Sequence, residues 1–392
     1  MTLQKKIIEA CRQQQVEIVQ IRRDIHRNPE IGFDVERTAG IAVRELEKLG
    51  VNVRTGVGKT GVVGDIVVPG AKKRIALRAD MDALPMQEMG NPDYKSLIEG
   101  KAHMCGHDSH TAMLIGAARV ISELKDHLKA NVRFIFQPNE ENLPGGAPAM
   151  IADGALEGVD EIFGLHVWPI IDTQTIGICE GAALGQPDVF NIEITGKGGH
   201  AAVPHLTVDP IIIGSQFVSN AQAIVARNID PLKSAVVSIT KFHAGSTHNV
   251  IPEKARITGT VRTFDKDIQR MIRNRLKNMI AALTAAHGAE YSFEYEQGYP
   301  VCFNHAASTE KALAAARSVV GEDNVFYPQQ PVLGGEDFAY YTQKIPGCFI
   351  FLGIRNPEKG VIYMCHDPRF DIDEDAMIEG MALHATLALR YA

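Results

Sequence analysis

The stretch "RIALRAD", residues 74–80, is a short apolar run that ends in charge. Further along, residues 111–128 ("TAMLIGAARVISELKDHL") carry apolar residues at helical spacing: Leu114, Ala117, Ile121, Leu124 and Leu128. Strand patterns return at 132–141 ("VRFIFQPNEE") and at 161–168 ("EIFGLHVW"). Strands that alternate with helices predict the α/β class, with a mostly parallel sheet covered on both faces.

Residues near 188–297 follow a different order. A strand and a helix are followed by two strands, a second helix and a final strand, which is the βαββαβ order of ferredoxin-like domains. Helices near 305–322 and 373–390 and a strand at 347–354 then indicate a return to the first domain. We therefore predict that 1–186 and 299–392 form one domain and that 187–298 form an inserted one.

The composition is typical of a globular protein. The chain has 392 residues, of which 45% are hydrophobic and 22% charged, and this length favours two domains. The formal net charge of −7 is spread out without a basic stripe, which argues against nucleic acid or a membrane as the partner. The N-terminal stretch lacks the apolar core of a signal peptide. The six cysteines follow no framework spacing, so we expect free thiols and a cytoplasmic protein.

Metal-binding residue types stand at the carboxyl ends of the predicted strands, where open α/β sheets bind their ligands. They are Asp80 and Asp82 after the first strand, Glu140 and Glu141 after the second, His166 on the third, the loop "HMCGHDSH" (103–110), and His366 beside Cys365. Thiolate, imidazole and carboxylate together favour zinc or another borderline transition metal over magnesium or calcium.

Each of these signals also has an ordinary structural explanation. Asp108 or Ser109 would cap a helix that starts in the histidine-rich loop. His166 could be a hydrogen-bonded core histidine, and Glu140 and Glu141 could be two surface charges. The joint placement of these residues at one edge of the sheet is what favours a metal site.

A series of longer motifs resembles the metal-dependent amidohydrolases, which include hippurate hydrolases, N-acetylamino-acid deacetylases, auxin-conjugate hydrolases and some carboxypeptidases. The motifs span the chain from about residue 22 to residue 378, and several are long and specific. In order they are "RADMDALP" (78–85), "HMCGHDSHTAMLIGAA" (103–118), "FQPNEE" (136–141), "GLHVWP" (164–169), "GKGGHAAVPH" (196–205), "HNVIP" (248–252), "GGEDFAYY" (334–341) and "CHDPRFDID" (365–373).

The resemblance implies a metallopeptidase-like catalytic domain with a mostly parallel mixed sheet, and an inserted ferredoxin-like lid or dimerisation domain. It implies two divalent metal ions per subunit (zinc, manganese, cobalt or nickel) with five ligands: Cys105, His107, Glu141, His166 and His366. Cys105, as a thiolate, would take the bridging position that a carboxylate holds in related branches. Asp80 would orient a ligand histidine, and Glu140 would be the general base.

Two departures from the family pattern lie beside the paired glutamates. Asn139 stands where a small residue is common, and "NLPGGA" (142–147) replaces a glycine-rich run. Neither departure changes a ligand, but both could reshape the floor of the pocket.

The inserted domain supplies further candidates by the same resemblance. His200 would donate to the oxyanion of the tetrahedral intermediate, and Asn249 and Arg262 would approach the substrate. Arg262 suits a carboxylate because its guanidinium can bind one in a bidentate fork. Gly335, which lies outside the inserted domain in the 299–392 part, would allow the backbone to approach the substrate closely. The ordinary alternatives are that His200 pins a turn and that Arg262 forms an ion pair on a strand surface.

The predicted activity is hydrolysis of the amide bond of N-acyl amino acids, with a small molecule as the partner. A carboxypeptidase or dipeptidase on the same scaffold, a metal-binding protein without catalysis, and a thiol-redox protein are the alternatives. The absence of a C-x-x-C pair argues against the last of these. Because the family commonly dimerises through this domain, we expect a homodimer or homotetramer. We also expect hinges near 184–188 and 296–300 that let the inserted domain close on substrate.

Overall fold

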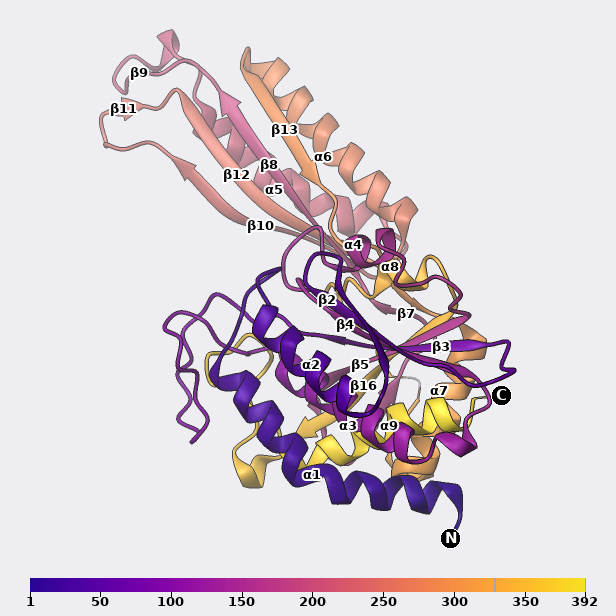
Figure 1. Ribbon diagram of the computed structural model, residues 1–392. Coiled ribbons are helices and arrows are strands. Elements are labelled where there is room, and N and C mark those ends of the chain that lie inside the picture. The colour runs from indigo at the N-terminus through magenta and orange to yellow at the C-terminus, as the bar shows by residue number, and fades with distance from the viewer. Residues whose placement is uncertain (328, 392) are drawn as a thin grey trace. The chain divides into compact units, whose positions relative to one another are not determined.

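The computed structural model describes residues 1–327 and 329–391, and the chain divides into two units (Figure 1). The first unit consists of Met1–Ala183, Cys302–Pro331 and Asp337–Ala392. The second consists of Leu184–Val301 and Val332–Glu336. The limits expected from the sequence, 186/187 and 298/299, fall a few residues inside the second unit, and the return of 332–336 to that unit was not expected.

An eight-stranded mixed sheet forms the centre of the first unit. Its order is β1 (Asn52–Val57), β2 (Gly61–Ile66), β4 (Asn131–Gln137), β3 (Arg74–Asp80), β5 (Glu161–Asp172), β16 (Gly347–Arg355), β6 (Ile176–Ile178) and β15 (Val325–Phe326). The four central strands β4, β3, β5 and β16 are parallel, whereas β1, β2 and β6 pair antiparallel with their neighbours towards the centre. The predicted mostly parallel mixed sheet is therefore confirmed.

Helices cover both faces of this sheet, and Figure 1 shows α1, α3 and α9 on one side with α4 and α8 on the other. The helices of the unit are α1 (Leu3–Arg27), α2 (Glu36–Lys48), α3 (His107–Glu123), α4 (Ala147–Ala152), α7 (Ala306–Val320), α8 (Ala339–Thr342) and α9 (Met377–Leu389). Short 3-10 turns occur at Lys125–His127, Glu322–Asn324, Pro357–Lys359 and Glu374–Ala376, and β7 (Gly181–Leu184) pairs with β14 (Cys302–Asn304).

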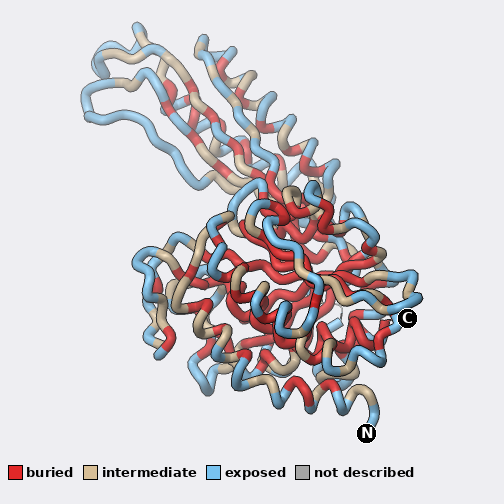
Figure 2. Tube along the Cα trace, in the orientation of Figure 1, coloured by how far each residue is buried: buried red, intermediate tan, exposed pale blue. Residues whose placement is uncertain are grey.

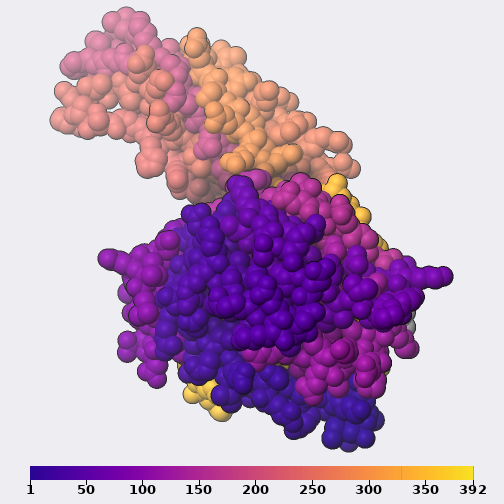
Figure 3. Space-filling model, in the orientation of Figure 1, coloured from indigo at the N-terminus to yellow at the C-terminus, as the bar shows by residue number. Residues whose placement is uncertain are grey.

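The core of the first unit explains why its strands read as continuous apolar runs. On β3, Ile75, Leu77 and Ala79 join the core that also contains α3, while Arg78 on the other face reaches Asp337. Both faces of the strand are therefore covered, as expected for a central parallel strand. Figure 2 shows buried residues gathered along these strands, and Figure 3 shows that N-terminal residues, in indigo, cover the visible face of the unit.

The second unit has the βαββαβ element order predicted from the sequence. Its antiparallel sheet runs β10 (Ala235–Ala244), β12 (Lys254–Thr263), β8 (Gln186–Thr195) and β13 (Glu290–Glu296). The helices α5 (Pro210–Asn228) and α6 (Lys266–His287) bury one face of the sheet. A small ladder of β9 (Gly199–His200) and β11 (Val250–Ile251) extends from it, and a 3-10 turn lies at Pro204–Leu206.

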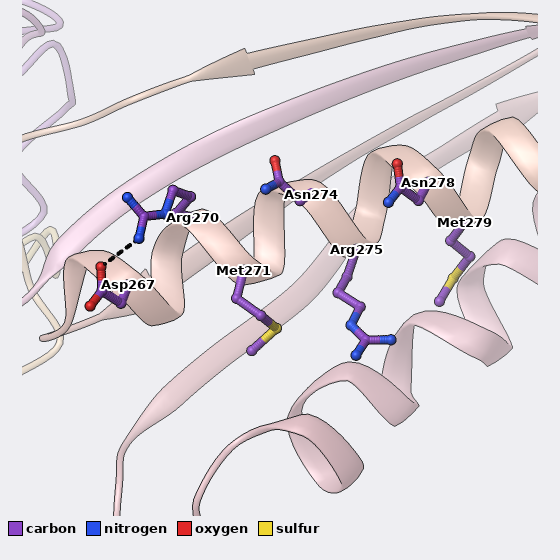
Figure 4. A pocket seen from close by; sticks show the side chains of 7 residues that line it. All are labelled: Asp267, Arg270, Met271, Asn274, Arg275, Asn278 and Met279. Carbon is purple, nitrogen blue, oxygen red and sulfur yellow. Dashed lines mark hydrogen bonds and ion pairs between the residues drawn. The ribbon is translucent and has the colours of Figure 1, made fainter.

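A hollow of 630 Å³ lies along α6 (Figure 4). Met271 and Arg275 point from it towards the neighbouring helix, and Arg270 pairs with Asp267 at 2.9 Å. Its lining residues include no histidine or cysteine. The hollow therefore lacks the donor set of the predicted metal site, despite its size.

Among residues 1–327 and 329–391, no helix combines the length and the apolar character that a membrane span requires.

Candidate metal centre

The parallel strands bring the predicted ligands to one edge of the sheet. β3 ends at Asp80, β4 is followed by Glu140 and Glu141, and β5 carries His166. The loop that enters α3 brings Cys105 and His107, and the backbone N–H of His366 donates to the carbonyl oxygen of Met104 at 2.7 Å. Residues far apart in the sequence thus meet at the carboxyl ends of β3, β4 and β5, where open α/β sheets bind ligands.

The five predicted ligands form two overlapping groups. Cys105, His107 and His166 make one group, and Cys105, Glu141 and His366 make the other; within each, the ligand atoms lie within 4.8 Å of one another. Cys105 Sγ lies 3.3 Å from His166 Nε2, and Glu141 Oε1 lies 3.4 Å from His366 Nε2. Cys105 is the residue that these two groups share.

Buried atoms without partners test whether this donor set fits a metal. Within the described residues, His107 Nε2 and Glu141 Oε1 are buried and have no hydrogen-bond partner. The other ring nitrogen of His107 donates to the Asp82 carbonyl oxygen at 2.8 Å, and Nδ1 of His166 donates to the Val167 carbonyl oxygen at 2.6 Å. Both histidines are thereby held with Nε2 as the lone-pair nitrogen, as metal-ligating histidines require. The set of sulfur, nitrogen and oxygen donors fits zinc or a similar transition metal.

A third group, formed by Asp80, His107 and His110, fits a metal less well. His110 Nδ1 donates to Asp80 Oδ1 at 2.6 Å, and His110 Nε2 accepts from the Val167 N–H at 2.9 Å. Both ring nitrogens of His110 are therefore already used.

Asp80 lies beside the predicted ligand His107 and hydrogen-bonds to two other side chains. Its hydrogen bonds go to His110 and to Arg78, at 2.6 and 2.7 Å, and its Oδ2 lies 3.7 Å from Nε2 of His107. Burial alone would raise the pKa of Asp80, but His107, Arg78 and His110 hold it well below its usual range. Asp80 therefore acts on His107 through charge, and the backbone of Asp82 supplies the hydrogen bond that orients this ring.

Asp82, a strand-end candidate to which the sequence assigns no role, fixes the paired glutamates. Its carboxylate accepts from the backbone N–H of Glu140 at 2.8 Å and from that of Glu141 at 3.1 Å. Burial raises its pKa. A second missed residue is Asp337, whose backbone N–H donates to Glu140 Oε1 at 3.4 Å. The spacing of "RADMD" was the available sequence signal for Asp82.

The two departures beside the glutamates have local structural roles. Asn139 takes the left-handed conformation, with φ of 55°, which asparagine tolerates better than most residues. A Cβ on Gly145 would lie 2.5 Å from Asp337 Oδ2, and one on Gly146 would lie 1.8 Å from the Pro138 carbonyl oxygen. The sequence "NLPGGA" thus lets this loop pack closely around Asp337, whose pKa burial raises to about 6.

The capping explanation of the histidine-rich loop is wrong. Helix α3 begins at His107 after Gly106, and its N-cap makes no side-chain hydrogen bond. Asp108 instead accepts from Arg22 and His26, and Ser109 donates to the Gly106 carbonyl oxygen.

The pKa of Cys105 is raised well above its ordinary value by a hydrogen bond with Cys365, by burial and by Glu141. A cation beside the sulfur would favour its ionised form.

The candidates of the second unit fall into two places within it. His200 pairs with Val250 in the β9–β11 ladder, and the Ala201 N–H donates to the Asn249 carbonyl oxygen at 3.1 Å, so His200 and Asn249 are near neighbours. His200 Nδ1 accepts from the Ala202 N–H at 3.0 Å, which is the turn-pinning contact considered as its alternative.

Arg262 and Gly335 both lie at the segment 332–336. Arg262 Nη1 donates to the Leu333 carbonyl oxygen at 2.8 Å. A Cβ on Gly335 would lie 2.6 Å from Pro187 Cγ, so the close approach at this glycine is to Pro187.

Comparison with known proteins shows the family to which the chain belongs. Residues 76–390 match the model of peptidase family M20/M25/M40. N-acetylcysteine deacetylase of Bacillus subtilis is 39% identical, covering 95% of this chain and 96% of the relative. Thermostable carboxypeptidase 2 of Saccharolobus solfataricus is 39% identical, covering 96% and 95%. A solved structure of Bacillus subtilis YXEP, described as a dinuclear metal-binding peptidase, has a TM-score of 0.83 at 34% identity, covering 97% of this chain and 98% of that one. The chain therefore belongs to peptidase family M20/M25/M40 and is a metal-dependent amidohydrolase.

Proposed function

We propose that this enzyme hydrolyses the amide bond of N-acyl amino acids, with an acetyl, benzoyl or similar acyl group, using two divalent ions of zinc, manganese, cobalt or nickel. The observation that carries the proposal is the placement of Cys105 in both ligand groups, with Glu140 adjoining ligand Glu141. The deacetylase among the relatives supports the substrate class. Cys105, His107 and His166 would hold one ion, and Cys105, Glu141 and His366 the other.

The protein's own part in the reaction rests chiefly on Glu140. Two bound metal ions would supply Lewis acidity: they would lower the pKa of water and polarise the amide carbonyl. Glu140 is buried; its backbone N–H donates to the Asp82 carboxylate, and its Oε1 accepts from the backbone N–H of Asp337. We assign it the proton transfer: it takes a proton from the attacking water and delivers that proton to the leaving nitrogen.

We assign substrate recognition to the second unit. His200 would donate to the oxyanion, which exists only after attack, and Asn249 beside it would contact the substrate. Arg262 would bind the substrate carboxylate, because a guanidinium has five donors and the contact with Leu333 uses one of them. Gly335 would let the backbone approach the substrate.

We further propose that the second unit acts as a lid and as the interface of a homodimer or homotetramer. Its outer strands β10 and β13 each have one partner within the described chain, so each leaves an edge that another copy can pair with. Hinges near 184–188 and 296–300 would close an open resting state on substrate. His200 would then act in its own subunit or in the partner's.

The second candidate function, a carboxypeptidase or dipeptidase, is favoured by the carboxypeptidase relative. Both activities cleave an amide beside a free carboxylate, so the group on the acyl side distinguishes them.

One screen tests the proposal. Chain reconstituted with Mn²⁺, Co²⁺ or Zn²⁺ is assayed against acetyl, benzoyl and indole-acetyl amino acids, beside dipeptides with a free amino group. We expect the highest kcat/KM with an N-acyl amino acid. Faster cleavage of the dipeptides would replace the proposal with the second candidate.

His200→Ala should lower kcat by about 100- to 1,000-fold, the usual effect of removing one oxyanion donor. KM should change little, because the oxyanion is absent from the ground state. His205→Ala is the matched control, since His205 is also exposed and lies five residues further on, in the 3-10 turn Pro204–Leu206, without an assigned role. Steady-state kinetics would remove His200 from the catalytic residues if its replacement raised KM and left kcat normal.

A further inference from the structure

A buried arginine on α1 contacts the two segments that carry the metal ligands. The Arg22 side chain is 0% exposed. Its Nε donates to Asp108 Oδ2 at 2.7 Å, its Nη2 to Asp371 Oδ1 at 2.8 Å and its Nη1 to Glu374 Oε1 at 3.1 Å. One guanidinium therefore uses all three of its nitrogens on three different carboxylates.

These carboxylates lie in the two ligand-bearing parts of the chain. Asp108 directly follows His107 in the first turn of α3, which begins at the ligand loop. Asp371 and Glu374 follow His366 in the segment that leads into α9. Arg22 is thus a link between the Cys105–His107 side of the centre and the His366 side, in addition to the backbone bond from His366 to Met104.

The neighbours of Arg22 reinforce this link. Tyr94 lies under the guanidinium, with its ring centroid 4.7 Å from Arg22 Cζ, and its hydroxyl donates to Asp371 Oδ2 at 2.6 Å. His26 shares Asp108 Oδ2 at 2.8 Å and faces Glu88 at 3.4 Å. Without Arg22, the fully buried Asp108 would lose its nearest permanent positive charge, and a buried carboxylate in that position must move or take up a proton.

The backbone of His366 shows why its position needs such support. His366 has φ of 69°, a left-handed conformation that a residue with a Cβ rarely adopts, and its side chain is 55% exposed. Strain of this kind persists only where the surroundings fix the conformation. The segment after His366 is fixed on one side by Arg22 and on the other by the N–H groups of Met89 and Gly90, which donate to the Pro368 carbonyl oxygen.

We infer that Arg22 is a positioning residue of the dinuclear centre: it sets the distance between the Cys105–His107 loop and His366. The inference rests on the proposed function, since it assumes that these residues bind two ions. Its expected consequence is that Arg22 determines metal affinity, and above all the affinity of the site that contains His366.

The test is a Co²⁺ titration of the metal-free full chain, followed by calorimetry and by the thiolate-to-cobalt charge-transfer absorption. Arg22→Lys keeps the positive charge but cannot reach three carboxylates with a planar fork. We expect it to weaken Co²⁺ binding by about 10- to 100-fold, the usual effect of losing a partner outside the ligands, and to alter the charge-transfer band. Arg22→Met should bind Co²⁺ more weakly still, so that the lysine variant retains part of the Co²⁺ affinity that the methionine variant loses.

Arg23→Met is the matched control. Arg23 is the next residue on α1, it lies over the same Tyr94 ring at 4.6 Å and it also binds Glu374, but its side chain is 32% exposed. We expect its replacement to change Co²⁺ affinity by less than about threefold, as for an exposed ion pair.

Two results would overturn the inference in distinguishable ways. If Arg22→Lys binds Co²⁺ with the affinity and spectrum of the natural chain, Arg22 serves stability alone, whatever happens to the unfolding temperature. Since Arg22→Lys retains the charge, it decides the matter even if Arg22→Met does not fold. If the natural chain itself binds no Co²⁺, both the proposed dinuclear function and the inference fall.

Discussion

Glu140→Gln should lower kcat by about 100- to 10,000-fold, because an amide cannot accept the proton that general-base catalysis requires. The replacement has nearly the same shape, and the loop around it is held by Asp82 through backbone N–H groups, which the change leaves in place. Metal content should therefore stay the same. Kinetics with the best N-acyl amino acid and elemental analysis of the same sample provide the measurement.

Glu141→Gln is the matched control for this result. Glu141 is the proposed ligand beside Cys105 and His366, and its Oε1 is buried without a hydrogen-bond partner among the described residues, so its replacement should lose metal together with activity. Full activity in Glu140→Gln would show that another group moves the proton.

Cys105→Ala should remove both metal ions and reduce activity by at least about 100-fold, since activation of the water depends on these two ions. The reason is that Cys105 belongs to both ligand groups, whereas His366 belongs to one of them. His366→Ala should accordingly lose one ion and keep the other. Elemental analysis after reloading and desalting distinguishes the two variants, and two retained ions in Cys105→Ala would contradict the bridging role.

The strands and helices were predictable where local pattern and tertiary packing agree. The stretch 74–80 reads as apolar because both faces of β3 are covered, and the element order of the second unit matches the order read from its sequence. The five proposed ligands come from strand ends and from motifs that resemble the family, which also implied a shared Cys105. The fold adds that their ligand atoms lie close together in two groups.

The supporting residues could not be predicted, because their partners are distant in sequence. Asp108 looked like a helix cap and binds Arg22, which is 86 positions away. Asp80 hydrogen-bonds His110, which is 30 positions away, since the first turn of α3 directs that ring towards it. Asp337 lies 197 positions from Glu140, and nothing in the local pattern joins them.

The most direct test of the central claim is a metal titration of the apoenzyme during hydrolysis of an N-acyl amino acid. The chain is stripped with a chelator, Mn²⁺ or Zn²⁺ is added back, and bound metal is counted in each sample. We predict no activity without metal, and activity that rises with occupancy until two ions are bound per chain. Full activity in a chain that elemental analysis shows to be free of transition metal would contradict the account.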